Sequence, residues 1–415
     1  TKFLICTMNS NQKDKIINDP IYGFITIDNG IITDLIEHPY FQRLRRISQL
    51  GLSYLVYPGA THSRFHHAIG SLHLMTKAIN QIKKKGNKIL KEEEEALKIA
   101  ILLHDIGHGP FSHALENSII TGISHEQLSS LLMCKLNNEF NGKLSIAIKI
   151  FNNTYKKKFL HQLVSSQLDM DRLDYLKRDS FFSGVREGDI GSERIINMLN
   201  VIDDELVIEE KGIYSIEQFL IARRLMYWQV YLHKTVVSAE YMLIKVLKRA
   251  KFLLQNNKKI FVTPSLDFLL KNNFQKEDFK SKKSLLDNFL LIDDFDIYTC
   301  LKNWQESNDF VLSNLSYRLV NRKILKIKIS TKKIPKMEQK KIVNNFCKKY
   351  NCSKEEASFF IFSHKIYNKT YNVKKAKINI LMKNGNIIDI TTASDQFNLE
   401  VLNKTVYKYF ICYPN

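Results

Sequence analysis

The dipeptide His104-Asp105 ends the apolar run at residues 101–103 and precedes a glycine-containing break at 106–110. A buried aspartate without a charged partner is costly, so this pair is poor material for a hydrophobic core. Neutral imidazole and ionised carboxylate are instead ligands for divalent metal ions, and such an ion makes a nucleophile from water near neutral pH. The pair therefore requires a fold that brings other polar or charged groups opposite it.

Two further segments supply such groups. The stretch 61–74 contains His62, His66, His67 and His73, and the stretch 165–179 contains Asp169, Asp171, Asp174 and Asp179. On a helix, Asp171 and Tyr175 share a face, and Arg178 falls on the same stripe. Each histidine alone is equally compatible with a satisfied surface position. Together, the three segments predict a compact site of nitrogen and oxygen ligands.

Length and composition indicate a globular protein. The 415 residues, 44% hydrophobic and 25% charged, suit one large domain or two ordinary ones. No apolar run approaches the roughly 20 residues needed to cross a bilayer, and no export signal is evident. The six cysteines lack C-x-x-C spacing. We therefore expect a reduced cytoplasmic protein without a membrane partner.

The net charge of +20 permits two interpretations. Basic runs at 83–85, 156–158 and 331–341 are compatible with a nucleic-acid surface. The chain is also rich in Lys, Asn and Ile throughout, and such a bias combined with a small anionic substrate explains the charge equally directly. We favour the second interpretation, and nucleic acid remains an open but less favoured partner.

The sequence pattern predicts a mainly α fold with two parts. Residues 15–32 read as a turn with two short strands. Helical patterns follow at 34–49, 66–85, 92–104, 111–118, 125–138, 143–152, 159–178, 192–200 and 215–255, the last containing one long helix. Two amphipathic helices are expected in 265–310, then a strand at 321–330, a hairpin at 375–392 and a closing strand near the end. We expect a catalytic helical domain over 15–255 and a smaller C-terminal α+β lobe over 256–415, packed on it.

An ordered series of motifs gives the chain a family resemblance. INDPIYGFI, HPYFQRLRRISQLGLSYLVYPGATHSRFHHAIG, HDIGHGPFSHALE, HEQ, DMDRLDYLKRD and RRLMYWQVYLHK follow one another over roughly residues 15–250. In this order and spacing, they resemble the HD-domain phosphohydrolases, specifically the branch of deoxynucleoside triphosphate (dNTP) triphosphohydrolases related to the animal sterile-alpha-motif/HD-domain dNTPase. The resemblance implies an HD-domain helical core.

The resemblance also implies the residues of a catalytic centre. The metal ligands implied are His67, His104, Asp105 and Asp171, and the acid–base residues are His113, Glu116 and His125. Glu116 stands where the relative has aspartate, and His66 replaces an acidic residue beside the ligand. The cofactor implied is a divalent ion, and a His2Asp2 set accommodates Mg, Mn, Fe or Zn.

A substrate site is implied by further matching positions. They are Gln49, Leu50, Arg64, Tyr175, Lys177, Asp179, Arg223, Tyr231 and Lys234. Among them, the cationic side chains match polyphosphate contacts, for which guanidinium forks are well suited. Gln49 and Asp179 match contacts to the 3′ hydroxyl, and Leu50 and Tyr231 match groups that crowd the 2′ carbon. Tyr231 is also compatible with a plain core aromatic on a long helix.

A regulatory nucleotide site has counterparts as well. Lys15, Ile16, Asn18, Glu37, Gln42 and Arg45 match positions that hold an activating nucleotide between subunits, which implies a homo-oligomer, a dimer or a tetramer. The same N-terminal residues are equally compatible with a turn that only packs the start of the chain.

Three functions are compatible with these residues. The leading hypothesis is metal-dependent hydrolysis of dNTPs to a deoxynucleoside and inorganic triphosphate, with activation by a nucleotide. The alternative is an HD-type phosphodiesterase or nuclease acting on RNA, DNA or a signalling nucleotide, which the positive charge favours slightly. A sensor with weak catalysis is the third, and the intact ligand set argues against it because a pure sensor needs no open metal position.

Overall fold

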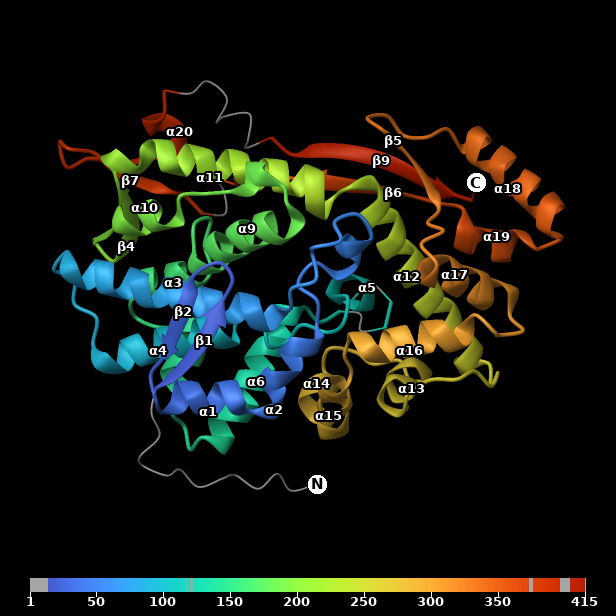
Figure 1. Cartoon of the computed structure of the whole chain (residues 1–415), viewed down its shortest axis with the longest axis horizontal. Helices are drawn as coiled ribbons and strands as arrows, with labels where there is room; N and C mark the ends of the chain where they lie inside the picture. Colours follow the sequence, from blue (N-terminus) through green and yellow to red (C-terminus); the bar gives the residue numbers. More distant parts are fainter. Residues whose placement is uncertain (1–13, 117, 120–121, 373–375, 396–403, 415) are drawn as a thin grey trace.

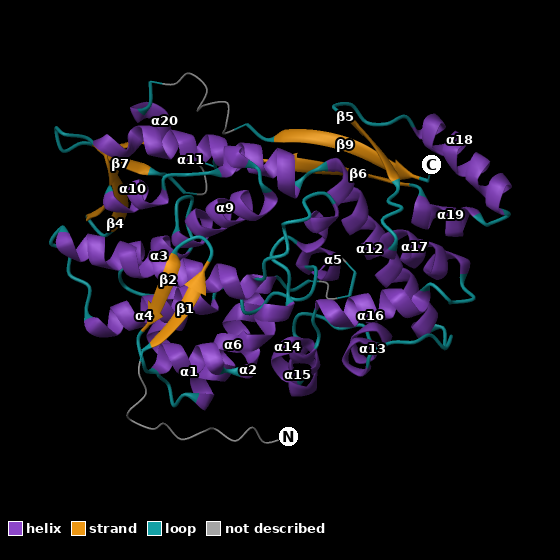
Figure 2. Cartoon of the chain, in the orientation of Figure 1, coloured by secondary structure: helices purple, strands orange, loops and turns teal. Residues whose placement is uncertain are grey.

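The computed structural model describes residues 14–116, 118–119, 122–372, 376–395 and 404–414, and among these the side chains of residues 112, 113 and 280 are not described. Helices form most of the molecule; two small sheets lie at its upper left and upper right, and a two-stranded sheet lies in front of the helices (Figures 1 and 2). The predicted mainly α fold with a smaller C-terminal α+β part is confirmed. Within the described residues, no helix is long and apolar enough to cross a membrane.

The chain enters through a hairpin. Strand β1 (Lys15–Asp19) pairs antiparallel with β2 (Gly23–Ile27), as predicted. The Asp19 carboxylate accepts hydrogen bonds from the backbone N–H groups of Ile21 and Tyr22, at 2.8 and 3.0 Å, and thereby closes the turn. Gly23 completes the turn at φ +73°, a conformation that glycine adopts without strain.

The single helix predicted at 34–49 is wrong. The segment is divided into α1 (Ile31–Glu37), α2 (Pro39–Gln42) and a 3-10 turn (Arg43–Arg46). His38 has an extended backbone because it precedes a proline, and α2 restarts with Pro39 in its first turn.

Helix α3 (Arg64–Lys84) is the central element, and it packs against α4 (Lys91–Leu103) and α9 (Met170–Ser183). Around them lie α5 (Ser112–Glu116), α6 (His125–Glu139), α7 (Ser145–Phe151) and α8 (Lys158–Val164). The helix predicted over 159–178 breaks between α8 and α9. Asp169 explains the break, because its carboxylate caps α9 by accepting from the backbone N–H of Arg172 at 2.7 Å.

A third helix prediction fails near the middle of the chain. After α10 (Ser192–Asn197), the hairpin of β3 (Leu199–Ile202) and β4 (Glu205–Glu209) was not predicted. The long helix expected in 215–255 is α11 (Ile213–Met226), a π turn (Tyr227–Tyr231) and α12 (Lys234–Gln255). His233 separates them with an extended backbone, and its ring accepts from the backbone N–H of Thr235 at 3.3 Å, so it begins α12 as a cap.

The C-terminal part begins with helices α13 (Pro264–Lys271), α14 (Asp278–Ser281), α15 (Lys283–Leu291), α16 (Asp294–Trp304) and α17 (Phe310–Val320), more than the two that were predicted. Then follow β5 (Lys326–Ser330), α18 (Lys336–Tyr350), α19 (Lys354–Phe360), β6 (Phe362–Asn368), β7 (Asn379–Leu381), β8 (Ile387–Asp389), α20 (Ile390–Ala393) and β9 (Val406–Tyr413). The expected strand, hairpin and closing strand are present in it.

Sheet pairing connects the two predicted parts. One sheet has the order β5-β9-β6 and is antiparallel throughout. Another has the order β3-β4-β7-β8, so that β7 pairs in parallel with β4 across more than 150 residues of sequence. The proposed division at 255/256 therefore separates segments that share one sheet, and it stays a prediction.

Candidate metal centre

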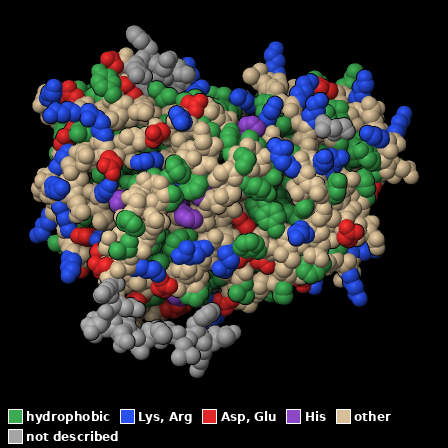
Figure 3. Space-filling view, viewed as in Figure 1, with side chains coloured by type: hydrophobic (Ala, Val, Ile, Leu, Met, Phe, Trp, Pro, Cys, Tyr) green, Lys and Arg blue, Asp and Glu red, His purple; other side chains and the backbone are tan. Residues whose placement is uncertain are grey.

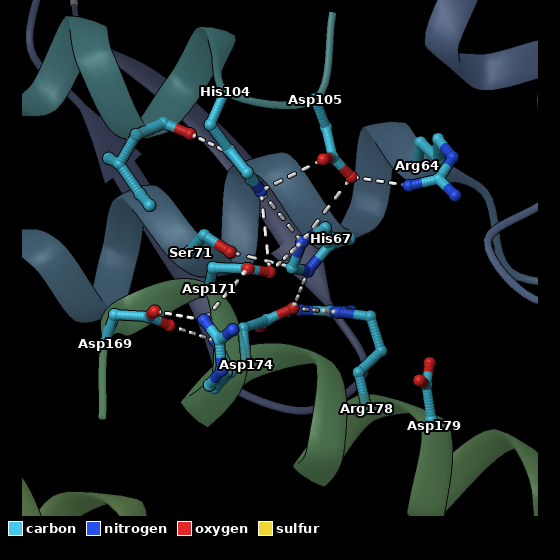
Figure 4. Close-up of polar contacts among 12 residues, drawn as sticks. Arg64, His67, Ser71, His104, Asp105, Asp169, Asp171, Asp174, Arg178 and Asp179 are labelled. Atoms are coloured by element: carbon cyan, nitrogen blue, oxygen red, sulfur yellow. Dashed lines mark hydrogen bonds and ion pairs between the residues drawn. The ribbon is translucent and has the colours of Figure 1, made fainter. Parts of the chain in front are cut away.

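Three helix ends converge on one point, and each provides one ligand-type side chain (Figure 4). His67 lies in the first turn of α3, His104 directly follows α4, and Asp171 lies in the first turn of α9. The His67 Nε2 atom lies 3.3 Å from His104 Nε2 and 3.1 Å from Asp171 Oδ1. His104 Nε2 lies 3.5 Å from the same Asp171 oxygen. Helix packing thus brings together three residues that lie 37 and 67 positions apart in sequence.

The far side of each imidazole is held by an acceptor. The Nδ1 of His67 lies 2.7 Å from Asp174 Oδ2, and the Nδ1 of His104 lies 2.6 Å from the carbonyl oxygen of Ile101. A carboxylate and a carbonyl only accept, so we assign the proton of each neutral ring to Nδ1. Two Nε2 lone pairs then face each other beside a carboxylate, an arrangement that a cation between them satisfies. The residues present therefore fit a divalent metal ion.

A fully buried ion network fixes the orientation of His67. Arg178 donates to Asp174 from Nε at 2.9 Å and from Nη2 at 3.0 Å, and from Nη1 to Asp19 at 2.8 Å. Asp174 and Arg178 are completely buried. Gly70 makes room for them, because a Cβ there would lie 2.0 Å from Asp174 Oδ1. The network therefore ties the N-terminal hairpin, α3 and α9 to the ligand cluster.

Asp105 lies at the edge of this cluster. Its Oδ1 is 3.4 Å from His104 Nε2, and its Oδ2 is 3.9 Å from His67 Nε2. The same Oδ2 accepts from Nη1 of Arg64 at 2.5 Å (Figure 4). Burial by itself raises the pKa of the Asp105 carboxyl, but its interactions with His104, His108 and Arg64 outweigh burial and hold that pKa well below its usual range. Asp105 is thus an ionised carboxylate beside the three converging side chains, and its role as a ligand remains a prediction.

The pKa values of His67 and Asp171 are shifted in opposite directions because the two side chains interact with each other. Burial by itself lowers the pKa of His67, but hydrogen bonds to Asp171 and Asp174 outweigh it and raise that pKa to about 10. Burial raises the pKa of Asp171, and the two histidines more than reverse the effect, so that its carboxyl is held ionised. The carboxylates thus create a strong preference for positive charge at this point, and a metal ion supplies such charge.

A second group of acid–base side chains lies next to Asp105. His108 Nε2 is 3.2 Å from Asp105 Oδ1, and its ring stacks on that of His125 with centroids 3.9 Å apart. Glu116 accepts from His125, whose Nδ1 lies 2.9 Å from Oε1. Sequence reasoning missed His108, although its place four residues after His104 was a usable signal. His113 was also predicted here, but its side chain lies outside the described part of the structure.

The structure brings together some of the residues that were predicted to contact the sugar. Asp179 accepts from the Tyr231 hydroxyl at 2.8 Å, and its other oxygen lies 2.8 Å from Nε2 of His62, which was not predicted. The Tyr175 and Tyr231 rings are in edge contact at 6.2 Å. The backbone N–H of Gln49 bonds the carbonyl of His62, and its buried side-chain oxygen has no partner among the described residues.

The predicted substrate cations divide into two groups. Arg64 and Arg223 are buried, and each has an Nε without a hydrogen-bond partner among the described residues. Arg223 otherwise donates to Gln167 at 3.2 Å. Lys177 instead lies 5.3 Å from the centre of the Tyr22 ring, which packs against the Asp174–Arg178 network. Lys234 is exposed at the start of α12, and Leu50 is half-buried.

The residues of the predicted regulatory site form two small contacts on the surface. Lys15 is paired with Glu37, and Gln42 accepts from Nε of Arg45 at 2.8 Å. The Arg45 guanidinium also lies 3.6 Å from the centre of the Phe65 ring. Ile16 and Asn18 are exposed on β1. These groups occupy neighbouring elements of the N-terminal segment.

Comparison with known proteins agrees with this geometry. Residues 64–179 match the model of the HD domain, and residues 190–260 match that of the HD associated region. A solved phosphohydrolase from Bacteroides thetaiotaomicron superimposes with a TM-score of 0.94 at 51% identity, covering 97% of this chain and 100% of that one. The chain is 35% identical over 320 residues to YwfO of Bacillus subtilis, covering 75% of this chain and 71% of that protein. It therefore belongs to the HD-domain phosphohydrolases.

Within that family, its relatives include dNTPases. The chain is 31% identical over 345 residues to a protein of Dictyostelium discoideum named as a homolog of the deoxynucleoside triphosphate triphosphohydrolase SAMHD1. That match covers 79% of this chain and 63% of the relative. The predicted resemblance to the dNTP triphosphohydrolase branch is confirmed. The chain is a hydrolase of this kind of fold, and its substrate is a separate question.

Proposed function

We propose that the chain hydrolyses dNTPs to a deoxynucleoside and inorganic triphosphate at the His67–His104–Asp171 cluster. The observation that carries the proposal is the pair of facing Nε2 atoms beside a carboxylate oxygen, with both Nδ1 atoms already committed to acceptors. The similarity to proteins named as dNTPases supplies the substrate class.

The proposed metal site consists of His67, His104 and Asp171, with Asp105 as a fourth ligand. When bound, a divalent ion supplies charge that lowers the pKa of water and neutralises phosphate oxygens. The chain's own contribution is to fix the ligands in place, because the Asp174 carboxylate and the Ile101 carbonyl orient the two rings. The residue types do not select among Mg, Mn, Fe and Zn.

His125 is the proposed general acid. Burial by itself lowers its pKa, but the hydrogen bond to Glu116 and the Asp105 charge raise it above the ordinary histidine value. The ring therefore keeps its proton to a higher pH than an ordinary histidine, and it donates that proton to the sugar 5′ oxygen as that oxygen leaves. Burial and the Arg64 charge lower the pKa of His108, so that its ring is neutral. This ring stacks on the His125 ring and holds it in position. His113 remains a second candidate for the acid.

The buried guanidinium groups of Arg64 and Arg223 are the proposed polyphosphate contacts. A buried Nε–H without a partner is costly unless a ligand accepts from it, and phosphate oxygens are suitable acceptors. Lys177 and Lys234 are weaker candidates, because one lies over Tyr22 and the other is exposed.

Sugar selection is assigned to Gln49, Leu50, Tyr175, Asp179 and Tyr231. The buried Gln49 oxygen has no partner among the described residues and is the proposed acceptor for the 3′ hydroxyl, so an analogue without that hydroxyl leaves it unpaired. The Asp179 carboxylate, which already accepts from Tyr231, is the second proposed contact of the same hydroxyl. Leu50 and the Tyr231 ring exclude an added 2′ oxygen by contact. Ribonucleotides and 3′-deoxy analogues should therefore be poor substrates.

Phosphorus NMR of the products tests the proposal. Purified protein with each dNTP and a divalent metal should release inorganic triphosphate and no pyrophosphate. His104→Ala should abolish the signal, and the matched control His66→Ala should retain most of it, because the His66 ring bonds Ser63 and none of the ligands. Cleavage of an oligonucleotide or a cyclic nucleotide with no triphosphate released would establish the phosphodiesterase alternative instead.

Activation by a nucleotide between subunits is a further part of the proposal. It rests on the positions of Lys15, Ile16, Asn18, Glu37, Gln42 and Arg45 on neighbouring elements near the surface. Hydrolysis should then rise sigmoidally with dNTP in a dimer or tetramer. Hyperbolic kinetics in a stable oligomer would contradict it.

A further inference from the structure

The sheet β5-β9-β6 has a solvent-facing side that the proposed hydrolysis does not use. It lies at the upper margin of the molecule in Figure 1, above α12 and beside α18. In antiparallel strands, directly opposed residues point to the same side. The register opposes Tyr367 to Tyr407, and it opposes Lys365 to Tyr409. These four residues, which we call the tyrosine–lysine face, therefore share one side of the sheet.

The other side of the sheet is core. Phe362, Ile366, Phe410 and Cys412 point there and are buried. The tyrosine–lysine face is open by contrast: Tyr367 is 61% exposed and Tyr407 is 48% exposed. Their rings lie 5.9 Å apart between centroids, and the Lys365 ammonium is 5.5 Å from the centre of the Tyr407 ring. Two large aromatic rings and a cation thus stand together in solvent.

Helix α18 covers only one end of this side. Glu338 pairs with Lys328 at 2.7 Å, the Ser363 hydroxyl bonds Gln339 at 3.2 Å, and Ile411 is completely buried. The Tyr367–Tyr407 pair lies four residues further along the register than the Ser363–Ile411 pair, beyond these contacts. The covered end is therefore distinct from the open end.

The charge of the surrounding segment is strongly positive. Residues 321–415 contain 20 Lys and Arg against 6 Asp and Glu, whereas residues 1–320 contain 42 against 36. Lys332 and Lys333 follow β5 and are exposed. Lys and Arg side chains are frequent along the upper right of the space-filling view (Figure 3). The excess charge is thus concentrated in the part of the chain that forms this sheet.

We propose that the tyrosine–lysine face binds single-stranded nucleic acid. Exposed rings on a sheet stack on unpaired bases, and lysines around them neutralise the phosphates. The Tyr367 and Tyr407 rings are tilted by 42° with centroids 5.9 Å apart, so they are not stacked on each other, which suits bases that are splayed rather than stacked on each other. A duplex hides its base faces and does not use the rings.

Fluorescence anisotropy with labelled oligothymidylate and oligouridylate of about 20 nucleotides tests the proposal. The full chain is titrated at about 50 and 200 mM salt, with EDTA present so that cleavage at the metal centre does not contribute. The double variant Tyr367→Ala/Tyr407→Ala should bind at least about tenfold more weakly, with an unchanged salt slope. Lys365→Ala should lower the salt slope by about one. Tyr214→Ala, a 70% exposed tyrosine on α11, is the matched control and should bind like the unaltered chain.

Three results would overturn the proposal. One is equal binding by the double variant and the control. Another is equal affinity for a duplex of the same length, which would indicate charge attraction without stacking. The third is loss of oligomer mass in the double variant by light scattering with oligonucleotide binding intact, which would make the face a contact between copies of this chain. A preference between the two oligonucleotides only tells whether RNA or DNA is the ligand.

Discussion

Two charged regions of the molecule differ sharply in how they are held. Behind the metal centre, Asp174 and Arg178 are completely buried, and each has at least two charged or ring-nitrogen partners. On the N-terminal surface, Lys15 and Glu37 pair with each other, and their side chains are 38% and 53% exposed. Buried charges cannot exchange a lost partner for water, whereas exposed ones do so at little cost. The first region therefore fixes a geometry, and the second can change partners at little cost in free energy.

The largest effect is expected from Asp174→Ala. The substitution leaves the Arg178 guanidinium with Asp19 as its remaining carboxylate partner among the described residues, and it removes the acceptor of His67 Nδ1. Loss of one member of a buried ion pair costs about 3–5 kcal/mol in the free energy of unfolding. Chemical denaturation followed by circular dichroism measures it. A loss below about 1 kcal/mol would mean that the buried network behaves like a surface pair.

Gly70→Ala tests the packing of the same region and leaves its charges unchanged. The added Cβ would lie 2.0 Å from Asp174 Oδ1 and 2.1 Å from Arg178 Nη2, so the pair must move. Overpacking of this kind costs about 1–3 kcal/mol of unfolding free energy. Gly191→Ala is the control, because its nearest atom would be 3.9 Å away. Equal stability of the two variants would show that α3 and α9 adjust freely.

The His125–Glu116 pair is intermediate, with side chains 27% and 26% exposed. The raised pKa of His125 places the loss of activity on the alkaline side, since the general acid must be protonated. Glu116→Gln removes the charge that helps to raise this pKa, so the alkaline limb of the kcat/KM profile should move to lower pH. An unmoved limb would mean that His125 is not the acid, which would favour His113.

The smallest effect on stability is expected from Glu37→Ala. Loss of its exposed pair with Lys15 should change the free energy of unfolding by less than about 1 kcal/mol. Arg45→Ala should likewise leave the metal centre intact while suppressing activation by nucleotide. A stability loss comparable with that of Asp174→Ala would show that the N-terminal surface is structural instead of regulatory.

The sequence predicted the ligand-type residues of the site better than the buried residues that hold them in place. His67, His104 and Asp171 could be predicted from the sequence because their residue types and their order form a motif. The structure brings them within hydrogen-bonding distance of one another. The Asp174–Arg178–Asp19 network was not predicted, because i,i+4 spacing does not tell which partner from a distant hairpin completes an ion pair. His62 and His108 were passed over for a similar reason, since a histidine's role depends on its neighbours in space.

Element breaks were the least predictable part of the fold. The predicted helices continued through 165–169 and 232–233, yet Asp169 and His233 cap new helices there with their side chains. A side chain that caps a new helix offers the backbone an alternative to continuing the previous helix. Tertiary contacts decide which of the two the chain adopts, and the sequence pattern does not contain them. The β3–β4 hairpin was missed because its completed sheet depends on strands β7 and β8 from far along the chain.

Metal content tests the central assignment most directly. Elemental analysis of the purified chain, after loading with a divalent ion and gel filtration, should give about one ion per chain. His104→Ala should lose the ion, and His66→Ala, whose ring is turned to Ser63, should keep it. Equal metal content in the two variants would contradict the assignment of the His67–His104–Asp171 cluster as the metal centre.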